Sequence, residues 1–203
     1  MKNILLGMFC CMLIGCSVAP LNKSVVRQEP YKNAAGKSLS ISVNKVVNAI
    51  DSKKVVGKFY AGTACVDHGD LRYRGSDRFI NEMTNYVRSK LEEYGYSVIG
   101  KAHSPFNEEF SGQSNFILGG KVIDVQANIC YSVNGAKGEA YTKVEWQIYD
   151  NKKKSIILTL TTEGYAALKD FDSTGDAMLF DPAFQMAVDN LLASKAFYGL
   201  LIK

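Results

Sequence analysis

The sequence of 203 residues is poor in the residues from which most catalytic and metal sites are built. It contains only two histidines, one tryptophan and four prolines. No apolar run reaches the roughly 20 residues that a membrane-spanning helix needs. Four prolines and 17 glycines also exclude the collagen-like and low-complexity classes. A hydrophobic content of 47% excludes a disordered chain, because it provides enough apolar surface for a core.

Recognisable catalytic and nucleotide-binding motifs are missing as well. There is no Gly-x-Ser-x-Gly nucleophile motif, no Walker loop and no glycine fingerprint between a strand and a helix. The net charge is +4, from 24 basic and 20 acidic residues, and the basic residues are scattered. A nucleic-acid-binding protein is expected to carry a clustered basic face. We therefore expect no nucleic-acid partner, no cofactor and no enzymatic activity.

The first sixteen residues have the form of an export signal that ends in a cysteine. Lys2 precedes an apolar stretch of about ten residues, which fits a cleaved secretory signal better than a membrane span. Leu13-Ile14-Gly15-Cys16 resembles the lipobox of bacterial lipoproteins. The resemblance implies a signal peptide over residues 1–15, diacylglycerol on the Cys16 sulfur and acylation of the new amino terminus, which together give stable anchoring. The alternatives are an uncleaved anchor, or an ordinary signal with a chance cysteine.

The residue after Cys16 bears on the membrane to which the protein is sorted. It is Ser17, where lipoproteins retained in the inner membrane usually carry aspartate. The resemblance to lipoproteins therefore implies the periplasmic face of the outer membrane, with the protein attached to it through the N-terminal lipid.

The lipobox interpretation accounts for an odd number of cysteines. Cys10 and Cys11 would leave with the signal peptide, and Cys16 would carry the lipid. Cys65 and Cys130 remain, and in an oxidising periplasm such a pair predicts a disulfide. The alternative is two separate buried thiols, each packing as a small hydrophobic side chain.

The mature chain divides into a tether and one domain. Residues 16–38 contain Pro20 and Pro30 among polar and small residues, with little periodicity. This composition is typical of a flexible linker between a lipidated N-terminus and a folded domain. We expect a single periplasmic domain over residues 39–203, which is long enough to bury a substantial core.

Several segments of this domain alternate apolar and polar residues, as strands do. The alternation is clearest in residues 141–149, where Thr142, Val144 and Trp146 lie on one face. It indicates an antiparallel sheet with one buried face and one wet face. Gly119-Gly120 predicts a bulge or bend in the longest strand. The predicted strands are 40–43, 54–61, 96–100, 115–131, 141–149 and 155–165.

Two other segments have apolar residues at helical spacing. Residues 77–94 form the first helix, with Ser76 placed to cap its start and Gly95 placed to end it. Asp181 and Pro182 suit the cap and first position of the second helix. The predicted fold class is therefore α+β: a two-layer domain whose mostly antiparallel sheet is covered on one face by two amphipathic helices.

The candidate catalytic residues are few. His68 lies between two aspartates in Asp67-His68-Gly69-Asp70, and His103 lies in a later polar segment. A metal or acid–base site would need further converging ligands, and the two histidines are not at ligand spacing. We interpret both as solvated side chains. The alternative function is a periplasmic hydrolase or small-ligand carrier with a site in the predicted loops 62–76 and 101–114.

The combination of a lipobox with a small α+β domain resembles several envelope lipoproteins. These are the periplasmic domain of the curli-secretion channel, the outer-membrane activators of peptidoglycan synthases and the amino-terminal domain of the Tol-system propeller protein. A second likeness is to the domain that precedes trypsin-like peptidases in some exported bacterial proteins. It rests on residues 116–124, 143–149 and 162–165 and on the terminal helix.

Neither likeness transfers a catalytic residue to this chain. Together they imply a lipid-anchored, non-catalytic envelope lipoprotein that acts as a protein-binding or assembly module. The expected partner is an envelope protein whose identity the sequence does not give.

Overall fold

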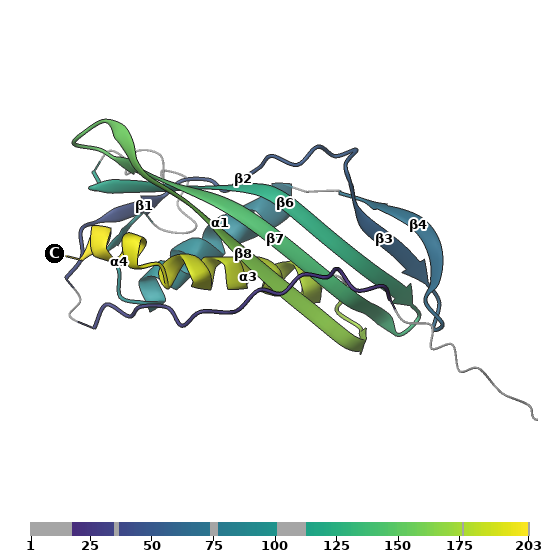
Figure 1. The fold of residues 1–203 in the computed structure, drawn as a ribbon. Coiled ribbons are helices and arrows are strands. Elements are labelled where there is room, and N and C mark those ends of the chain that lie inside the picture. Colours follow the sequence, from purple (N-terminus) through teal and green to yellow (C-terminus); the bar gives the residue numbers. More distant parts are fainter. Residues whose placement is uncertain (1–17, 35–36, 74–76, 101–112, 176, 203) are drawn as a thin grey trace, which may run out of the picture.

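The structure is a computed structural model that describes residues 18–34, 37–73, 77–100, 113–175 and 177–202. It has a long twisted sheet with helices packed on one face (Figure 1). The elements are β1 (Ile41–Val43), β2 (Val47–Asn48), β3 (Val55–Ala61), β4 (Val66–Arg72), α1 (Asp77–Glu93), β5 (Val98–Ile99), β6 (Phe116–Ser132), β7 (Gly135–Asp150), β8 (Ser155–Asp172), α3 (Ala177–Leu192) and α4 (Lys195–Leu201).

The sheet is built around β6. On one side, β6, β7 and β8 form an antiparallel meander of three long strands. On the other side, β1, β2 and β3 each pair with β6 in parallel, at successive positions along it. β5 adds to β1 in parallel, and β4 adds to β3 in antiparallel. The α+β class is confirmed, and its three longest strands pair antiparallel as predicted. The parallel pairings of the short strands were not predicted.

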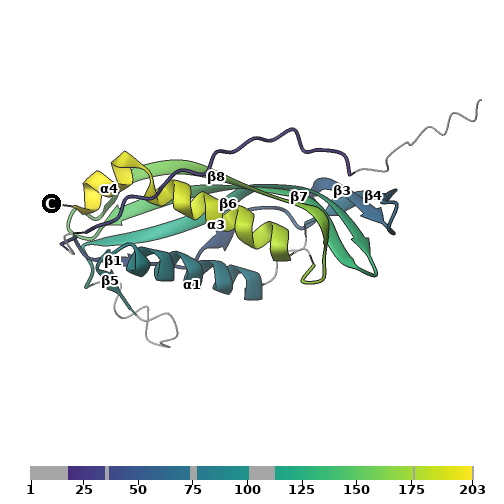
Figure 2. The same ribbon diagram turned by 90° about the horizontal axis from the view of Figure 1, so that it is seen from below.

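The helices cover one face of this sheet. Figures 1 and 2 show α1 and α3 side by side on that face. Gly95 has a φ of +82°, and the N–H of Tyr96 bonds to the carbonyl of Leu91 at 3.0 Å, which confirms the predicted stop of α1. Ser76, the predicted cap, lies outside the described residues. The apolar stripe of α1 is buried as predicted at Ile80, Met83, Val87 and Leu91.

α3 begins five residues before the predicted start at Pro182, so that prediction was wrong. The helix runs from Ala177 and contains Pro182 near its beginning, where the missing N–H removes one bond to the first turn. The earlier start buries Leu179 completely. α4 follows as a third helix, capped by Ser194, with Phe197 and Leu201 buried. Among the described residues, no helix combines the length and apolar character needed to cross a bilayer.

Trp146 at the centre of the sheet explains why residue 120 is a glycine. Its indole N–H donates to Thr162 Oγ1 at 2.7 Å, and that hydroxyl donates to the carbonyl of Ala187 in α3 at 2.7 Å. A Cβ on Gly120 would lie 2.6 Å from the indole ring. Of the bulge or bend predicted at Gly119-Gly120, the bulge was wrong. Both glycines are in regular register with β7, and the bulge lies between Val122 and Asp124.

Candidate functional site

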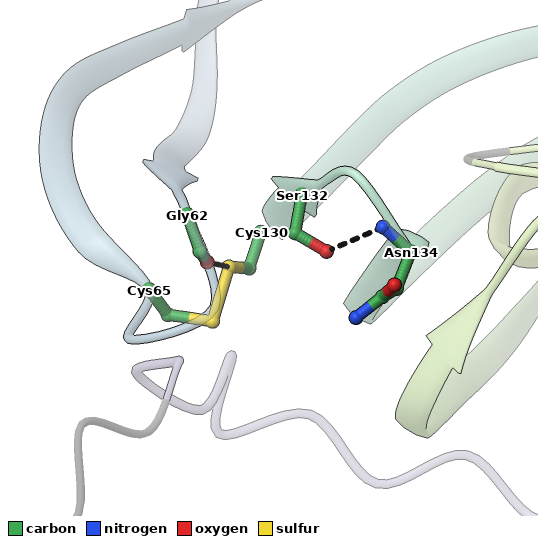
Figure 3. Close-up of a disulfide and its surroundings, with 5 residues drawn as sticks. All are labelled: Gly62, Cys65, Cys130, Ser132 and Asn134. Atoms are coloured by element: carbon green, nitrogen blue, oxygen red, sulfur yellow. Dashed lines mark hydrogen bonds between the residues drawn. A yellow bond between two sulfur atoms is a disulfide. The ribbon is translucent and has the colours of Figure 1, made fainter.

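Cys65 and Cys130 form the disulfide expected from the cysteine count. The Cα atoms are 5.5 Å apart, and the bond joins the β3–β4 turn to β6 (Figure 3). Cys65 has a φ of +51°, and its N–H bonds to the Gly62 carbonyl at 3.1 Å. The Cys130 sulfur lies 3.3 Å from that carbonyl oxygen, which is a contact because a disulfide sulfur has no proton to donate. The bridge fixes the turn between β3 and β4 to the central strand.

A small apolar cluster surrounds the bridge. Tyr60, Cys65 and Cys130 form its buried centre, and Val18 and Phe171 pack against them. The turns between β3 and β4 and between β6 and β7 lie at the same end of the sheet (Figure 1). We call this the disulfide end. Val18, the first described residue, packs at this end.

Residues 18–34, predicted as part of a flexible tether, are bound along the domain. We call them the N-terminal segment (Figures 1 and 2). The side-chain amide of Asn128 donates to the Ala19 carbonyl at 2.6 Å, and the Leu21 N–H donates to a Glu139 carboxylate oxygen at 2.8 Å. The Lys23 ammonium lies 4.6 Å from the centre of the Tyr141 ring. These contacts attach the first part of the segment to β6 and β7.

The middle of the segment binds α3. Arg27 forms an ion pair with Asp189, whose side chain is only 4% exposed, and its Nε donates to Asp189 Oδ2 at 2.7 Å. The hydrogen bond to Asp189 raises the pKa of the Arg27 guanidinium. The Gln28 N–H donates to Asn190 Oδ1 at 2.7 Å, and the amide of Asn190 also donates to the Glu163 carbonyl of β8 at 2.9 Å. Asn190 therefore links the segment, the helix and the sheet.

The last part of the segment reaches the end of α1. The Asn33 N–H donates to the Tyr94 carbonyl, and the Asn33 amide donates to the Gly95 carbonyl, each at 2.9 Å. Asn33 is buried. The segment differs from a free linker because its polar side chains and backbone groups bind polar groups of the domain over its whole length.

The predicted loop 62–76 was wrong for residues 66–72, which form the edge strand β4. β4 pairs with β3, and the register skips His68 between Phe59↔Gly69 and Tyr60↔Asp67. His68 is therefore the extra residue of a β-bulge, and Gly69 has the positive φ of +110° that such an irregularity often requires. β4 was not predicted because its sequence is mostly polar and does not alternate apolar with polar residues.

The aspartates beside His68 bind other partners. Asp67 Oδ1 accepts from the Gly69 N–H at 2.7 Å, and Asp70 Oδ1 lies 3.2 Å from Lys58 Nζ. The bond to Asp70 raises the pKa of Lys58. Within the described ranges, no group of three or more His, Cys, Asp or Glu side chains could hold a metal ion. His103 and residues 101–112 of the second predicted loop lie outside the described residues, as does Cys16.

His68 instead lies beside aromatic side chains. Its ring centre is 5.9 Å from that of Phe59, which is 5.6 Å from that of Tyr131. His68 is exposed, and Phe59 and Tyr131 are half-buried. We call Phe59, His68 and Tyr131 the aromatic row. Figure 2 shows β3 and β4 extending past the ends of α1 and α3. The arrangement places partly exposed rings next to an edge strand.

No family model matches the chain, and no curated protein matches it in sequence. Its fold has distant likenesses among solved structures. A protein of the DUF330 family from Xanthomonas campestris has 15% identity and a TM-score of 0.48, with 85% of this chain and 91% of that one covered. The PelC dodecamer subunit from Paraburkholderia phytofirmans has 10% identity and a TM-score of 0.45, with coverages of 84% and 97%.

A bacterial lipoprotein is also among the structural neighbours. Lipoprotein GNA1162 from Neisseria meningitidis has 11% identity and a TM-score of 0.37, with 67% of this chain and 88% of that one covered. At this distance no residue role transfers from these proteins to this chain.

Proposed function

We propose that this chain is a lipid-anchored, non-catalytic lipoprotein of the bacterial envelope that binds a partner protein through β4. The lipid would be attached at Cys16, and Ser17 favours the periplasmic face of the outer membrane. The observation that carries the binding function is the exposed edge strand β4, held at its turn by the disulfide and flanked by the aromatic row.

The β4 edge can accept an extended segment of another protein. Among the described residues β4 pairs with β3 alone, and each of its seven residues is exposed or half-buried. Backbone groups of an edge strand bind an added strand, while neighbouring side chains give specificity. The charges of Asp67 and Asp70 and the bulge at His68 limit indiscriminate pairing at such an edge. The aromatic row adds side chains of the type that is enriched at protein interfaces.

Site-specific photocrosslinking in intact cells tests the binding surface. A photoreactive residue at Asp67 or Asp70 is expected to give a discrete crosslinked protein. The same residue at Lys153, exposed in the β7–β8 turn at the opposite end, serves as the matched control. His68→Glu would place a charge in the aromatic row and is expected to lower the crosslink yield at least several-fold, whereas Lys153→Glu leaves it unchanged. Identical products from β4 and the control position would contradict the proposal.

Metabolic labelling with a fatty-acid analogue tests the anchor. The wild-type protein is expected to incorporate the label and to fractionate with the outer membrane, and Cys16→Ala to lose both properties. Ser17→Asp is expected to shift the labelled protein to the inner membrane. Label retained in Cys16→Ala would show that the modified residue is not Cys16.

A further inference from the structure

The chain from the proposed anchor to the folded domain is very short. Val18 packs on the cluster around the Cys65–Cys130 bridge, two residues after Cys16. Two extended residues span at most about 7 Å. A free linker of the 22 residues from Ser17 to Ser38 would have a root-mean-square length of roughly 25 Å. An anchor at Cys16 would therefore hold the disulfide end next to the lipid and leave the domain little freedom to move away.

The segment that would otherwise provide this length is fixed to the domain. Its bonds to Asn128, Asp189 and Gly95 are spread from one end of the segment to the other. Releasing only the first of these attachments would add few residues to the linker. The short distance between anchor and domain therefore depends on several independent contacts.

The disulfide end also exposes apolar side chains. Val133, in the turn between β6 and β7, is 97% exposed, and Val66, the first residue of β4, is 58% exposed. Phe171 of β8 packs near the bridge, and the Lys137 ammonium lies 4.6 Å from the centre of its ring. Lysine side chains suit a membrane interface, since an apolar stem carries a charged head. Exposure of these valine side chains to water is unfavourable, whereas contact with a lipid surface would remove their apolar area from water.

We propose that the disulfide end is a lipid-contacting surface, so that the domain stands on the bilayer with Val133 and Val66 at the interface. This inference rests on the proposed acylation of Cys16. The occupant is lipid because Val18, which packs at this end, is only two residues after the proposed anchor Cys16 in the sequence. The β4 edge begins at this surface, with Val66, so a partner bound there would itself lie at or in the same membrane.

Fluorescence quenching by spin-labelled lipid tests this orientation. The full lipidated protein is reconstituted in phosphatidylcholine vesicles that contain a lipid with a nitroxide near the headgroup. Val133→Trp places an indole at the disulfide end, and Lys153→Trp is the matched control at the opposite end. Trp146 is the only native tryptophan and is buried, so it adds the same background to both variants. Quenching at Val133→Trp is expected to be at least twofold greater than at Lys153→Trp.

Flotation of the same samples separates the two proposals. Flotation that depends on Cys16, combined with equal quenching at the two positions, would overturn the lipid-contacting surface and leave the anchor intact. Failure of the wild-type protein to float with vesicles would overturn the acylation and the orientation together. Greater quenching at Val133→Trp with Cys16-dependent flotation supports both.

Discussion

Arg27 and Asp189 are 162 residues apart in the sequence and form an ion pair between the N-terminal segment and α3. Asp189 is buried, whereas 60% of the Arg27 side chain is exposed. A buried carboxylate without its cation is costly, because desolvation is then not offset by pairing. The N-terminal segment is thus required to neutralise a charge inside the domain.

Arg27→Met is expected to lower the free energy of unfolding by about 2 kcal/mol, in the range for a hydrogen bond to a charged group. Urea unfolding measures the loss. Lys32→Met removes an exposed cation from the same segment and is the matched control, expected to change stability by less than about 0.5 kcal/mol. An equal effect of both variants would mean that net charge, and not the pair, sets the stability.

Gly164→Ala is expected to destabilise the domain by about 2 kcal/mol or more, because overpacking displaces backbone. An added Cβ would lie 1.8 Å from the Ala183 carbonyl oxygen, where α3 packs closely on β8. Gly199 lies within α4, and no atom beyond the local backbone of this helix lies within 4 Å of an added Cβ, so Gly199→Ala is the control. This control is expected to stabilise the domain by about 0.5 kcal/mol through helix propensity. Thermal unfolding of both variants measures the difference in stability between them. A loss of stability in Gly199→Ala but not in Gly164→Ala would refute the prediction.

Reduction of the Cys65–Cys130 bridge is expected to lower the free energy of unfolding by about 4 kcal/mol, from the closure of a loop with a sequence separation of 65. Urea unfolding with and without reductant measures the effect. The double variant Cys65→Ala/Cys130→Ala is expected to have a free energy of unfolding close to that of the reduced protein. Reductant is expected to leave this value unchanged. Alkylation of both cysteines in the non-reduced mature protein would exclude the bridge.

Stability is expected to decrease as the pH falls below about 4.5, partly through Glu163. Burial acts to raise the pKa of Glu163, but its bonds to Lys143 and Tyr141 outweigh this effect and lower the pKa from 4.5. The unfolded chain then binds the proton first, so the contribution of Glu163 is present above pH 4.5 and is lost as the pH falls through the folded-state pKa.

Urea midpoints between pH 7 and pH 3 measure this dependence. Glu163→Gln is expected to make the decrease in stability shallower than in the wild-type protein. Glu29→Gln, which removes an exposed carboxylate from the N-terminal segment, is the charge-matched control and is expected to follow the wild-type curve more closely. A steeper decrease in Glu163→Gln would contradict the assigned sign.

The parts of the fold that the sequence predicted correctly are those with a local periodic signal. Two such signals are the apolar stripe from Ile80 to Leu91 and the alternation around Trp146. Each arises because one helix or strand packs one face on the core, so the spacing of nearby residues in the sequence is enough to predict it. The parallel pairing of Ile41 with Phe116 joins residues far apart along the chain and leaves no local pattern. Such pairings could not be predicted from spacing alone.

The candidate site was only partly predictable for the same reason. The pairing of Cys65 with Cys130 followed from counting, because few cysteines remained after the export signal. Arg27 and Asn33 were missed, since a segment with prolines and polar side chains has the same composition whether it is free or bound. One signal was present: Asp189 lies close to the apolar stripe of α3, and a buried aspartate requires a cation elsewhere in the chain.

The binding of the N-terminal segment to α3 has a consequence for the order in which parts of the chain can fold. A chain synthesised from its amino terminus presents Arg27 long before Asp189, and at 5–20 residues per second the delay is on the order of ten seconds or more. During this interval α3 is absent, so Arg27 lacks its partner Asp189 and the N-terminal segment cannot bind the helix. The N-terminal segment is therefore expected to dock late, after the part of the chain that carries Asp189 has been made.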